Sequence, residues 1–374
     1  MNYTHSNIIP VSSYSTDGLC DGIPLRLHKR QILEDLGCIR VRAQEDWRAH
    51  VAPIGLVKGL LGPEYNLVST MFPECKPERV EVLSYFNEFV GLHDDVVEEV
   101  QQSLGDAQND EARNICLDAA ASGRKLPLER KQKRDHTGRP KMIRSVAEID
   151  PVHASVTLKL WAEWFDQGSG RKFHTRFGNL DEYLDYRVLD VGEKLTTGMA
   201  IFIMSLHIPE HEFSLLSELC RPAWVAMGLT NDIYSWDKEK KAADLAGETH
   251  LCNSIWVLMQ QYGIGKDEAE EKCGEIVREN VAEFVETVKG IHDRKDISRD
   301  LAVFVETAQY MISGNVVWSQ GVPRYNPQAR YNDRQLEWMI CGAPKVVKVK
   351  DVEERRVRPV FKSERMSSFV EVSV

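Results

Sequence analysis

Apolar residues recur at spacings of three and four positions along most of the chain, from about residue 26 to residue 320. The pattern is clearest in residues 79–104, 156–167, 182–206 and 301–320. Such spacing places apolar side chains on one face of an α-helix, which must then pack against other helices. Alternating strand patterns bounded by Asn-Gly or Asp-Gly turns are absent from the sequence. The sequence therefore predicts an all-α protein.

The domain organisation follows from changes in composition. Residues 26–330 show no internal boundary and no repeat of 20–50 residues, so we expect one helical domain, preceded by an N-terminal segment at residues 1–25. Lys and Arg cluster with Gly and Pro in residues 123–145, which predicts a basic loop within this domain. Residues 331–374 are predicted to form a C-terminal tail or linker, either disordered or an interaction arm, because charges alternate with valines after about residue 342.

Charge and cysteine content exclude several classes of protein. The net charge of −10 argues against nucleic acid as the main partner, because phosphate binding requires a basic surface. The most apolar segment, residues 199–206, is far shorter than the about 20 residues that span a bilayer, and the first residues lack a signal-peptide pattern. Eight scattered cysteines without a CxxC pair indicate reduced thiols. We expect a cytoplasmic protein without stable membrane insertion; both a monomer and a homo-oligomer are compatible with the sequence.

The segment GLTNDIYSWDKEK, residues 228–240, carries three metal-capable oxygens four positions apart: Asn231, Ser235 and Glu239. Residues four apart lie on one face of a helix. Magnesium prefers such hard oxygens and completes its shell with water and substrate phosphate. One carboxylate and two neutral oxygens would hold the ion weakly, so this site should fill when a phosphate arrives. Lys238, beside Glu239, would point toward that anion.

A solvated helix surface is the alternative interpretation of these three residues. The residues preceding them on the same face are Met227, Trp224, Ala223 and Cys220, which form an apolar surface. We therefore place the three oxygens at the rim of a buried wall.

A second polar cluster is formed by the carboxylates Asp94, Asp95 and Glu98, which share a helix face. Like charges this close repel, and a bound cation would relieve the repulsion; an acidic solvated turn is the alternative. The cluster follows an apolar stretch that contains Phe86 and Phe89. The two clusters together predict one polar rim above a central apolar cavity.

The motifs DDVVE and NDIYSWDKE resemble the paired metal motifs of class I terpene synthases, in the fungal forms DDxxE and NDxxSxxKE. Arg187 matches the diphosphate-sensing arginine of that family, and Arg324–Tyr325 matches its RY pair. Residues 14–29 resemble the start of the cyclase domain in fungal chimeric di- and sesterterpene synthases, and the similarity extends over about residues 11–330. Those chimeric proteins also carry a C-terminal prenyltransferase domain, whose aspartate-rich motifs are absent here. The chain is then either a separate cyclase or a cyclase domain that ends in a linker.

The resemblance implies a class I terpenoid synthase helical bundle and a role for each matching residue. Three Mg²⁺ ions would assemble with the substrate. Their ligands would be Asp94, Asp95, Glu98, Asn231, Ser235 and Glu239. The catalytic donors to the diphosphate oxygens would be Arg187, Lys238, Arg324 and Tyr325. A helix break at Asp190–Val191, next to Gly192, would relay diphosphate binding to the cavity.

The implied reaction is ionisation of a linear isoprenyl diphosphate and cyclisation of the carbocation. The substrate would be geranylgeranyl diphosphate (C20), with geranylfarnesyl diphosphate (C25) next and a C15 substrate third, and the product a polycyclic diterpene hydrocarbon. A prenyl diphosphate synthase, separate or fused, would supply the substrate. Trp224, Trp318 and Phe89 could face the cation, since aromatic faces stabilise cations by about 0.5–2 kcal/mol; ordinary core packing is the alternative.

Two other functions compete with cyclisation. An isoprenyl diphosphate synthase would carry two DDxxD-type motifs, whereas the second motif here is NDxxSxxKE. A non-catalytic helical scaffold would carry the acidic clusters as surface decoration. His93, directly before Asp94, we interpret as a structural histidine and not as a catalytic base.

Overall fold

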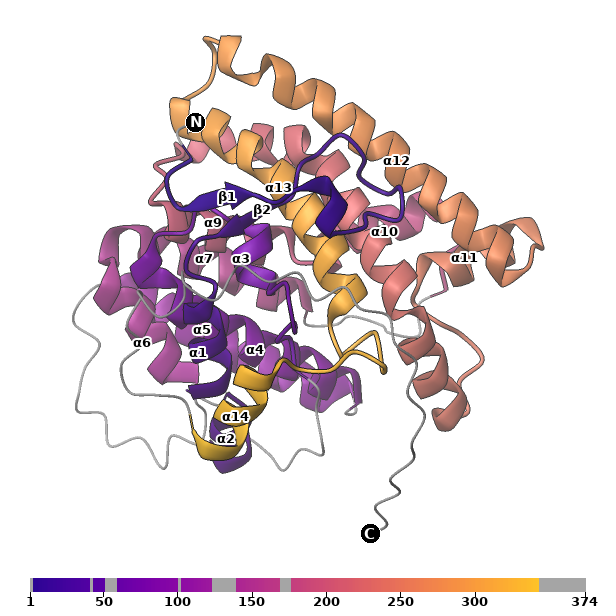
Figure 1. Cartoon of the computed structure of the whole chain (residues 1–374), viewed down its shortest axis with the longest axis horizontal. Coiled ribbons are helices and arrows are strands. Elements are labelled where there is room, and N and C mark those ends of the chain that lie inside the picture. The colour runs from indigo at the N-terminus through magenta and orange to yellow at the C-terminus, as the bar shows by residue number, and fades with distance from the viewer. Residues whose placement is uncertain are drawn as a thin grey trace.

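The computed structural model describes residues 3–40, 43–50, 59–99, 102–122, 139–168 and 176–342, and it confirms the predicted all-α class (Figure 1). Its helices, in chain order, are α1 (Ile32–Arg40), α2 (Ala43–His50), α3 (Leu67–Met71), α4 (Pro77–Glu99), α5 (Gln102–Ser122), α6 (Arg139–Ile149), α7 (Pro151–Gly168), α8 (Leu180–Asp190), α9 (Glu193–Met204), α10 (Phe213–Ala246), α11 (Ser254–Tyr262), α12 (Lys266–Gly290), α13 (Arg299–Gly321) and α14 (Asp333–Cys341).

Helix α10 is the central element of the part of the bundle that carries the second motif. It packs against α11, α12 and α13 (Figure 1) and also against α8. Residues 222–230 of α10 are buried without interruption. A helix that is apolar on all sides must be covered on all sides, and the sequence of this stretch explains the central position.

A glycine fixes the closest approach between two helices of the core. A Cβ atom added at Gly314 of α13 would lie 2.5 Å from the backbone carbon of Thr70 in α3. Real side chains do not tolerate such a distance, so this crossing requires glycine.

The helix break expected at Asp190–Val191 is present. Helix α8 ends at Asp190, and α9 begins at Glu193. Between them Gly192 adopts a left-handed conformation with φ of 93°, which glycine enters without steric cost. The amide of Val191 donates a hydrogen bond to the backbone oxygen of Arg187 at 2.8 Å. Arg187 therefore lies in the last hydrogen-bonded turn of α8, next to the break.

The N-terminal segment contains two short strands that the sequence pattern did not predict. Strands β1 (Ser6–Ile8) and β2 (Arg26–His28) pair antiparallel, with Ser6 opposite His28. Three residues are too few to show an alternating pattern. The segment is fixed to the bundle, because Glu74 accepts hydrogen bonds from the amides of Thr4 and His5.

The expectation that residues from 331 onward form a tail or linker is wrong for α14. Asn332 caps this helix in a capping box with Gln335, and Trp338 is buried against α1. The Arg334 guanidinium forms an ion pair with Asp35. Nine residues give too short a stripe to recognise, but the cap and these contacts hold the helix to the bundle.

Two other predicted segments are only partly described. The expected basic loop at residues 123–145 overlaps α6, which begins at Arg139, so its last residues are helical. Residues 123–138, and those after 342, lie outside the described part of the chain. Within the described ranges, no helix is both long and apolar enough to cross a membrane.

Candidate active site

The side-chain amide of Asn231 joins three segments that are distant in sequence. Its Oδ1 accepts a hydrogen bond from Arg187 Nη2 at 2.7 Å, and its Nδ2 donates to the Tyr325 hydroxyl at 2.8 Å. Arg187 comes from α8, Asn231 from α10, and Tyr325 from the segment after α13. Three residues predicted from three separate motifs therefore meet at one amide group.

The Arg187 guanidinium lies between two carboxylates and is only 12% exposed. Its Nη2 is 2.9 Å from Asp232 Oδ1, and its Nη1 pairs with Asp190. Burial opposes the charge of Arg187, but Asp232 and Asp190 outweigh this effect and raise its pKa well above the usual value. The site thus contains a fixed positive charge at every accessible pH.

Asp232 anchors the arginine from inside the bundle. The carboxylate is 1% exposed, and its Oδ2 accepts from the Tyr183 hydroxyl at 2.6 Å and from the Ser254 amide at 3.0 Å. Burial raises the pKa of Asp232 above its usual value, and the Arg187 charge offsets only part of this rise. Sequence reasoning assigned no role to Asp232, although it is the second residue of the NDIYSWDKE motif.

A glycine makes room for this arrangement. A Cβ atom added at Gly228, one turn before Asp232, would lie 3.1 Å from Arg187 Cγ and 3.8 Å from Val191 Cβ. The arginine therefore lies directly against the backbone of α10.

The residue types and spacing of Asn231, Ser235 and Glu239 fit a divalent cation. They follow one another at helical i, i+4 spacing on α10 and supply amide, hydroxyl and carboxylate oxygens. Ser235 Oγ is buried, and no hydrogen bond of standard geometry reaches it from the described residues. Burial raises the pKa of Glu239, the nearby Asp232 charge raises it further, and the Ser235 hydroxyl lowers it in part. A hard cation would engage the buried hydroxyl and offset the carboxylate repulsion.

The first predicted metal motif falls outside the part that can be tested. Helix α4 continues through Asp94, Asp95 and Glu98, but their side chains lie outside the described residues, and their position relative to Asn231 stays a prediction. His93 before them is buried, and its Nε2 lies 2.8 Å from Asn109 Oδ1. This contact agrees with a structural role for His93.

The other two predicted phosphate donors lie beside the cluster in sequence. Lys238 is half-buried and directly precedes Glu239 on α10. Arg324 is also half-buried, and its guanidinium carbon lies 6.0 Å from the ring centre of Tyr325. Donation from Lys238 and Arg324 to a phosphate stays a prediction.

The predicted aromatic residues differ in their surroundings. Trp318 is buried, donates from Nε1 to Leu60 O at 2.9 Å, and packs edge-on against Tyr325 with ring centres 5.7 Å apart. Trp318 therefore supports Tyr325 directly. Phe89 packs against Trp47, with ring centres 4.9 Å apart, which is a core contact.

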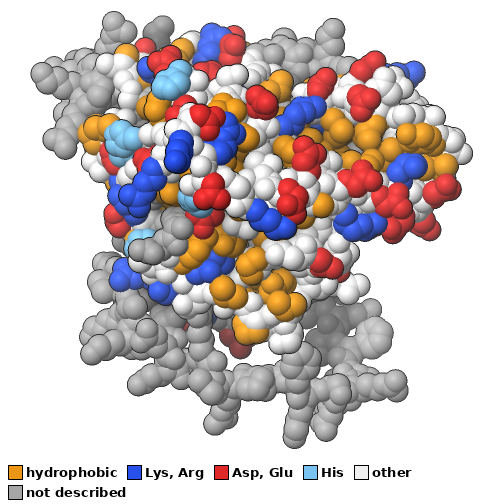
Figure 2. Space-filling view, turned by 90° about the horizontal axis from the view of Figure 1, so that it is seen from above, with side chains coloured by type: hydrophobic (Ala, Val, Ile, Leu, Met, Phe, Trp, Pro, Cys, Tyr) orange, Lys and Arg blue, Asp and Glu red, His pale blue; other side chains and the backbone are white. Residues whose placement is uncertain are grey.

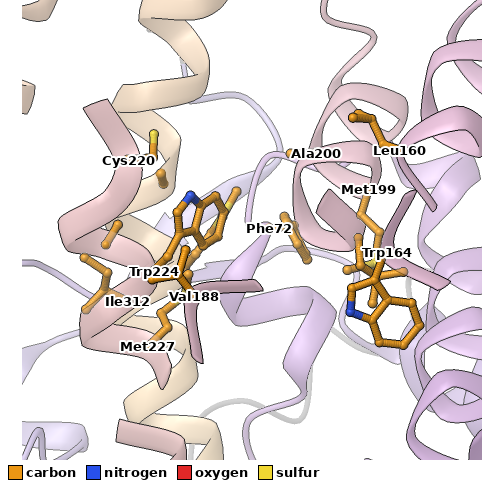
Figure 3. Packing of buried hydrophobic residues seen from close by; sticks show 14 of the residues in the cluster. Phe72, Leu160, Trp164, Val188, Met199, Ala200, Cys220, Trp224, Met227 and Ile312 are labelled. Carbon is orange, nitrogen blue, oxygen red and sulfur yellow. The ribbon is translucent and has the colours of Figure 1, made fainter. Parts of the chain in front are cut away.

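Trp224 belongs to the apolar cluster around Phe72, Val188 and Met227 (Figure 3). The side chain is 1% exposed, yet its indole N–H has no hydrogen-bond partner among the described residues. A buried donor without a partner is costly, so packing alone gives an incomplete account of this tryptophan.

A separate groove of about 840 Å³ lies along the opposite side of α10. Its walls include Ile233 and Asp237 of α10, which by helical geometry face away from Asn231, Ser235 and Glu239. Acidic and basic side chains of α12 also line it. The face shown in Figure 2 carries both kinds of charge, with Asp and Glu gathered toward its right-hand end. The groove is distinct from the Arg187 cluster and shares only its edge, Tyr325, with it.

The sequence is similar to that of one family of known proteins. Residues 85–283 match the family model described as terpene synthase family 2, C-terminal metal binding. The chain is 43% identical over 349 residues to fusicoccadiene synthase from Phomopsis amygdali, covering 92% of this chain and 48% of the relative. It is 36% identical over 345 residues to a bifunctional sesterterpene synthase from Aspergillus aculeatus, covering 92% and 48%. The chain spans about half the length of the curated relatives it matches.

Solved structures share the fold. Aristolochene synthase from Penicillium roqueforti superposes with a TM-score of 0.56 at 23% identity, covering 68% of this chain and 83% of that structure. A single-residue variant of cucumene synthase superposes with a TM-score of 0.60 at 17% identity, covering 81% and 98%.

Proposed function

Since the chain belongs to terpene synthase family 2, we propose that it ionises geranylgeranyl diphosphate and cyclises the carbocation to a polycyclic diterpene hydrocarbon, releasing diphosphate. The observation that carries this proposal is the Asn231 amide, which joins Arg187 to Tyr325. A scaffold protein would have no need to fix an arginine, a metal-capable amide and a tyrosine hydroxyl at one point.

Positively charged side chains of the protein would supply part of the electrostatic stabilisation in the proposed reaction. Negative charge develops on the diphosphate as its C–O bond breaks, and preorganised donors at that position lower the barrier. Arg187 is already oriented by Asp190 and Asp232, so it can donate to phosphate with little reorganisation. Arg324, Tyr325 and Lys238 would add further donors around the same group.

Magnesium is the cofactor in this proposal. Asn231, Ser235 and Glu239 would hold one ion, and Asp94, Asp95 and Glu98 on α4 would hold others, to a total of three. When bound, the ions supply Lewis-acid charge to the diphosphate oxygens. The weak ligand set on α10, with one carboxylate among three ligands, supports binding that depends on the substrate.

The names of the relatives support a long isoprenoid substrate. One relative is named a type I diterpene synthase, and others are named sesterterpene synthases. We therefore place the C20 substrate first, keep the C25 substrate as the alternative, and place C15 third. Trp224, with its buried indole N–H, and Trp318, beside Tyr325, would lie where the carbocation needs a dry aromatic surface.

The supplier of the substrate is part of the proposal. Relatives such as those from Aspergillus flavipes and Aspergillus aculeatus are named bifunctional, and this chain matches less than half of each. A prenyl diphosphate synthase, either fused or separate, would deliver the linear diphosphate in the cytoplasm. The acidic net charge supports a small-molecule substrate over nucleic acid.

Product analysis tests the proposal. The protein is incubated with Mg²⁺ and C15, C20 or C25 diphosphate in parallel, and the organic layer is analysed by gas chromatography–mass spectrometry. We expect a cyclic hydrocarbon from the C20 substrate. Hydrocarbon from the C25 substrate alone would favour the sesterterpene alternative, and a longer diphosphate would favour chain elongation. No product from any substrate would favour the scaffold.

A further inference from the structure

Asn253 ends the loop between α10 and α11 and is fully buried. It caps α11: its Oδ1 accepts a hydrogen bond from the Ile255 amide at 2.9 Å. A cap needs only this acceptor, which Ser, Thr or Asp supplies equally well. The cap of α8 offers a comparison, because Asn179 lies at an exposed site, accepts from Glu182 N at 3.0 Å and donates from Nδ2 to Glu182 Oε1 at 3.1 Å, within its own helix.

The amide donors of Asn253 have a second task. Nδ2 lies 3.0 Å from the backbone oxygen of Asp232 and 3.0 Å from Glu239 Oε2. An asparagine amide has two protons, so both are used on α10. The next residue, Ser254, donates its backbone amide to Asp232 Oδ2 at 3.0 Å. The first residues of α11 thus form hydrogen bonds with the metal-capable segment of α10 at Asp232 and at Glu239, which are nearly two helical turns apart.

The contact with Asn253 restricts the carboxylate of Glu239, which is the one charged ligand in the α10 motif. Glutamate has three side-chain torsions, and ordering such a side chain costs conformational entropy. With Oε2 held by Asn253, the orientation of the carboxylate is restricted, and with it the position of both oxygens toward an ion. The donor also offsets the repulsion that the buried Asp232 carboxylate exerts on Glu239.

We propose that Asn253 is a positioning residue, which holds Glu239 in the orientation that ligates the cation of the α10 motif. This inference rests on the proposed function of that motif. Ligand-orienting partners of this kind are typically worth about 10–100-fold in metal affinity.

Two substitutions separate positioning from capping. Asn253→Asp keeps the size and the capping oxygen but replaces the donor with an acceptor facing Glu239. Asn253→Ser also keeps a capping oxygen and removes both donors without adding charge. Asn179→Asp is the matched control, an equivalent change at a cap whose side chain bonds to Glu182 of its own helix.

The measurement is calorimetric titration of Mg²⁺ into each protein in the presence of inorganic diphosphate, with melting temperatures recorded in parallel. We expect the half-saturating Mg²⁺ concentration to rise about tenfold or more in both Asn253 variants and to stay unchanged in Asn179→Asp. In turnover assays, the Mg²⁺ concentration for half-maximal rate should rise by a larger factor than the factor by which kcat falls. Here kcat is measured at saturating Mg²⁺.

The outcomes distinguish the two hypotheses. If the wild-type protein does not bind Mg²⁺ with diphosphate, the proposed function of the site is wrong. If the wild-type protein binds and both Asn253 variants bind equally well, Asn253 is only a cap. If part of a variant is unfolded, the binding stoichiometry falls. If the half-saturating Mg²⁺ concentration of the folded part equals that of the wild type, the inference is also overturned.

Discussion

Two ion pairs join α8 to α10, and they offer a matched test of the buried one. Arg187 Nη2 lies 2.9 Å from Asp232 Oδ1, and these side chains are 12% and 1% exposed. Arg221 Nη2 lies 2.6 Å from Asp185 Oδ1, and these are 46% and 77% exposed. The substitutions Asp232→Asn and Asp185→Asn each remove one carboxylate charge at nearly constant volume.

The expected magnitudes differ because the surroundings differ. Removing one partner of a buried pair costs about 3–5 kcal/mol, since the remaining charge is left uncompensated. Asp190 still pairs with Arg187, so we expect the lower end, about 3 kcal/mol, for Asp232→Asn. An asparagine that keeps the Tyr183 hydrogen bond must also turn its amide nitrogen toward Arg187, which places two donors face to face. The exposed pair should contribute about 0–1 kcal/mol.

Urea and thermal unfolding followed by circular dichroism measure both variants against the wild type. At roughly 2 °C per kcal/mol for a chain of this size, Asp232→Asn should lower the melting temperature by about 6 °C, and Asp185→Asn by less than about 2 °C. Equal and small losses for the two variants would refute the view that the Arg187–Asp232 pair is a buried anchor. A loss at Asp185 larger than that at Asp232 would refute it as well.

Three further changes test other parts of the structure. Gly228→Ala adds a methyl group 3.1 Å from Arg187 Cγ, so we expect kcat to fall about tenfold because the guanidinium is displaced; unchanged steady-state kinetics would contradict this. Burial lowers the pKa of His28 to about 4, below the unfolded value of 6.5, so the stability of its neutral form is present above pH 6.5 and is lost as the pH falls toward 4. Between pH 7.5 and pH 5 the wild type should lose about 2 kcal/mol more than His28→Gln in urea unfolding, and parallel curves would exclude this role. Gln335→Ala removes donors to Asp35 and Gly62, and should cost about 2 kcal/mol and speed limited proteolysis near α14; an unchanged cleavage rate would count against that contact.

The sequence predicted those parts of the molecule that depend on local spacing. The three- and four-residue spacing of apolar residues predicted the long helices. The four-residue steps from Asn231 to Ser235 and Glu239 predicted that these side chains share one face of a helix. Motif matching added Arg187 and Tyr325. The structure brings Arg187 and Tyr325 to Asn231, although nothing in their own segments specifies that contact.

The parts that were missed depend on tertiary contacts or on very short elements. Asp232 and Asn253 act through hydrogen bonds between helices, which periodicity does not encode. Helix α14 spans nine residues, and its signal was the Asn332…Gln335 capping pair and not a stripe. Phe89 was predicted to face the cavity, with core packing as the alternative; its contact with Trp47 is a core contact, and the cavity role stays a prediction.

We propose that α8, α10 and the Arg324–Tyr325 segment form one site for diphosphate and divalent cation. A crystal structure of the protein grown with Mn²⁺ and inorganic diphosphate, with anomalous data, would show whether they do. We expect diphosphate oxygens about 2.7–2.9 Å from the Arg187 guanidinium and an anomalous peak in contact with Asn231 Oδ1 and Glu239. Diphosphate and Mn²⁺ bound elsewhere on the protein, with Arg187 touching neither, would contradict it.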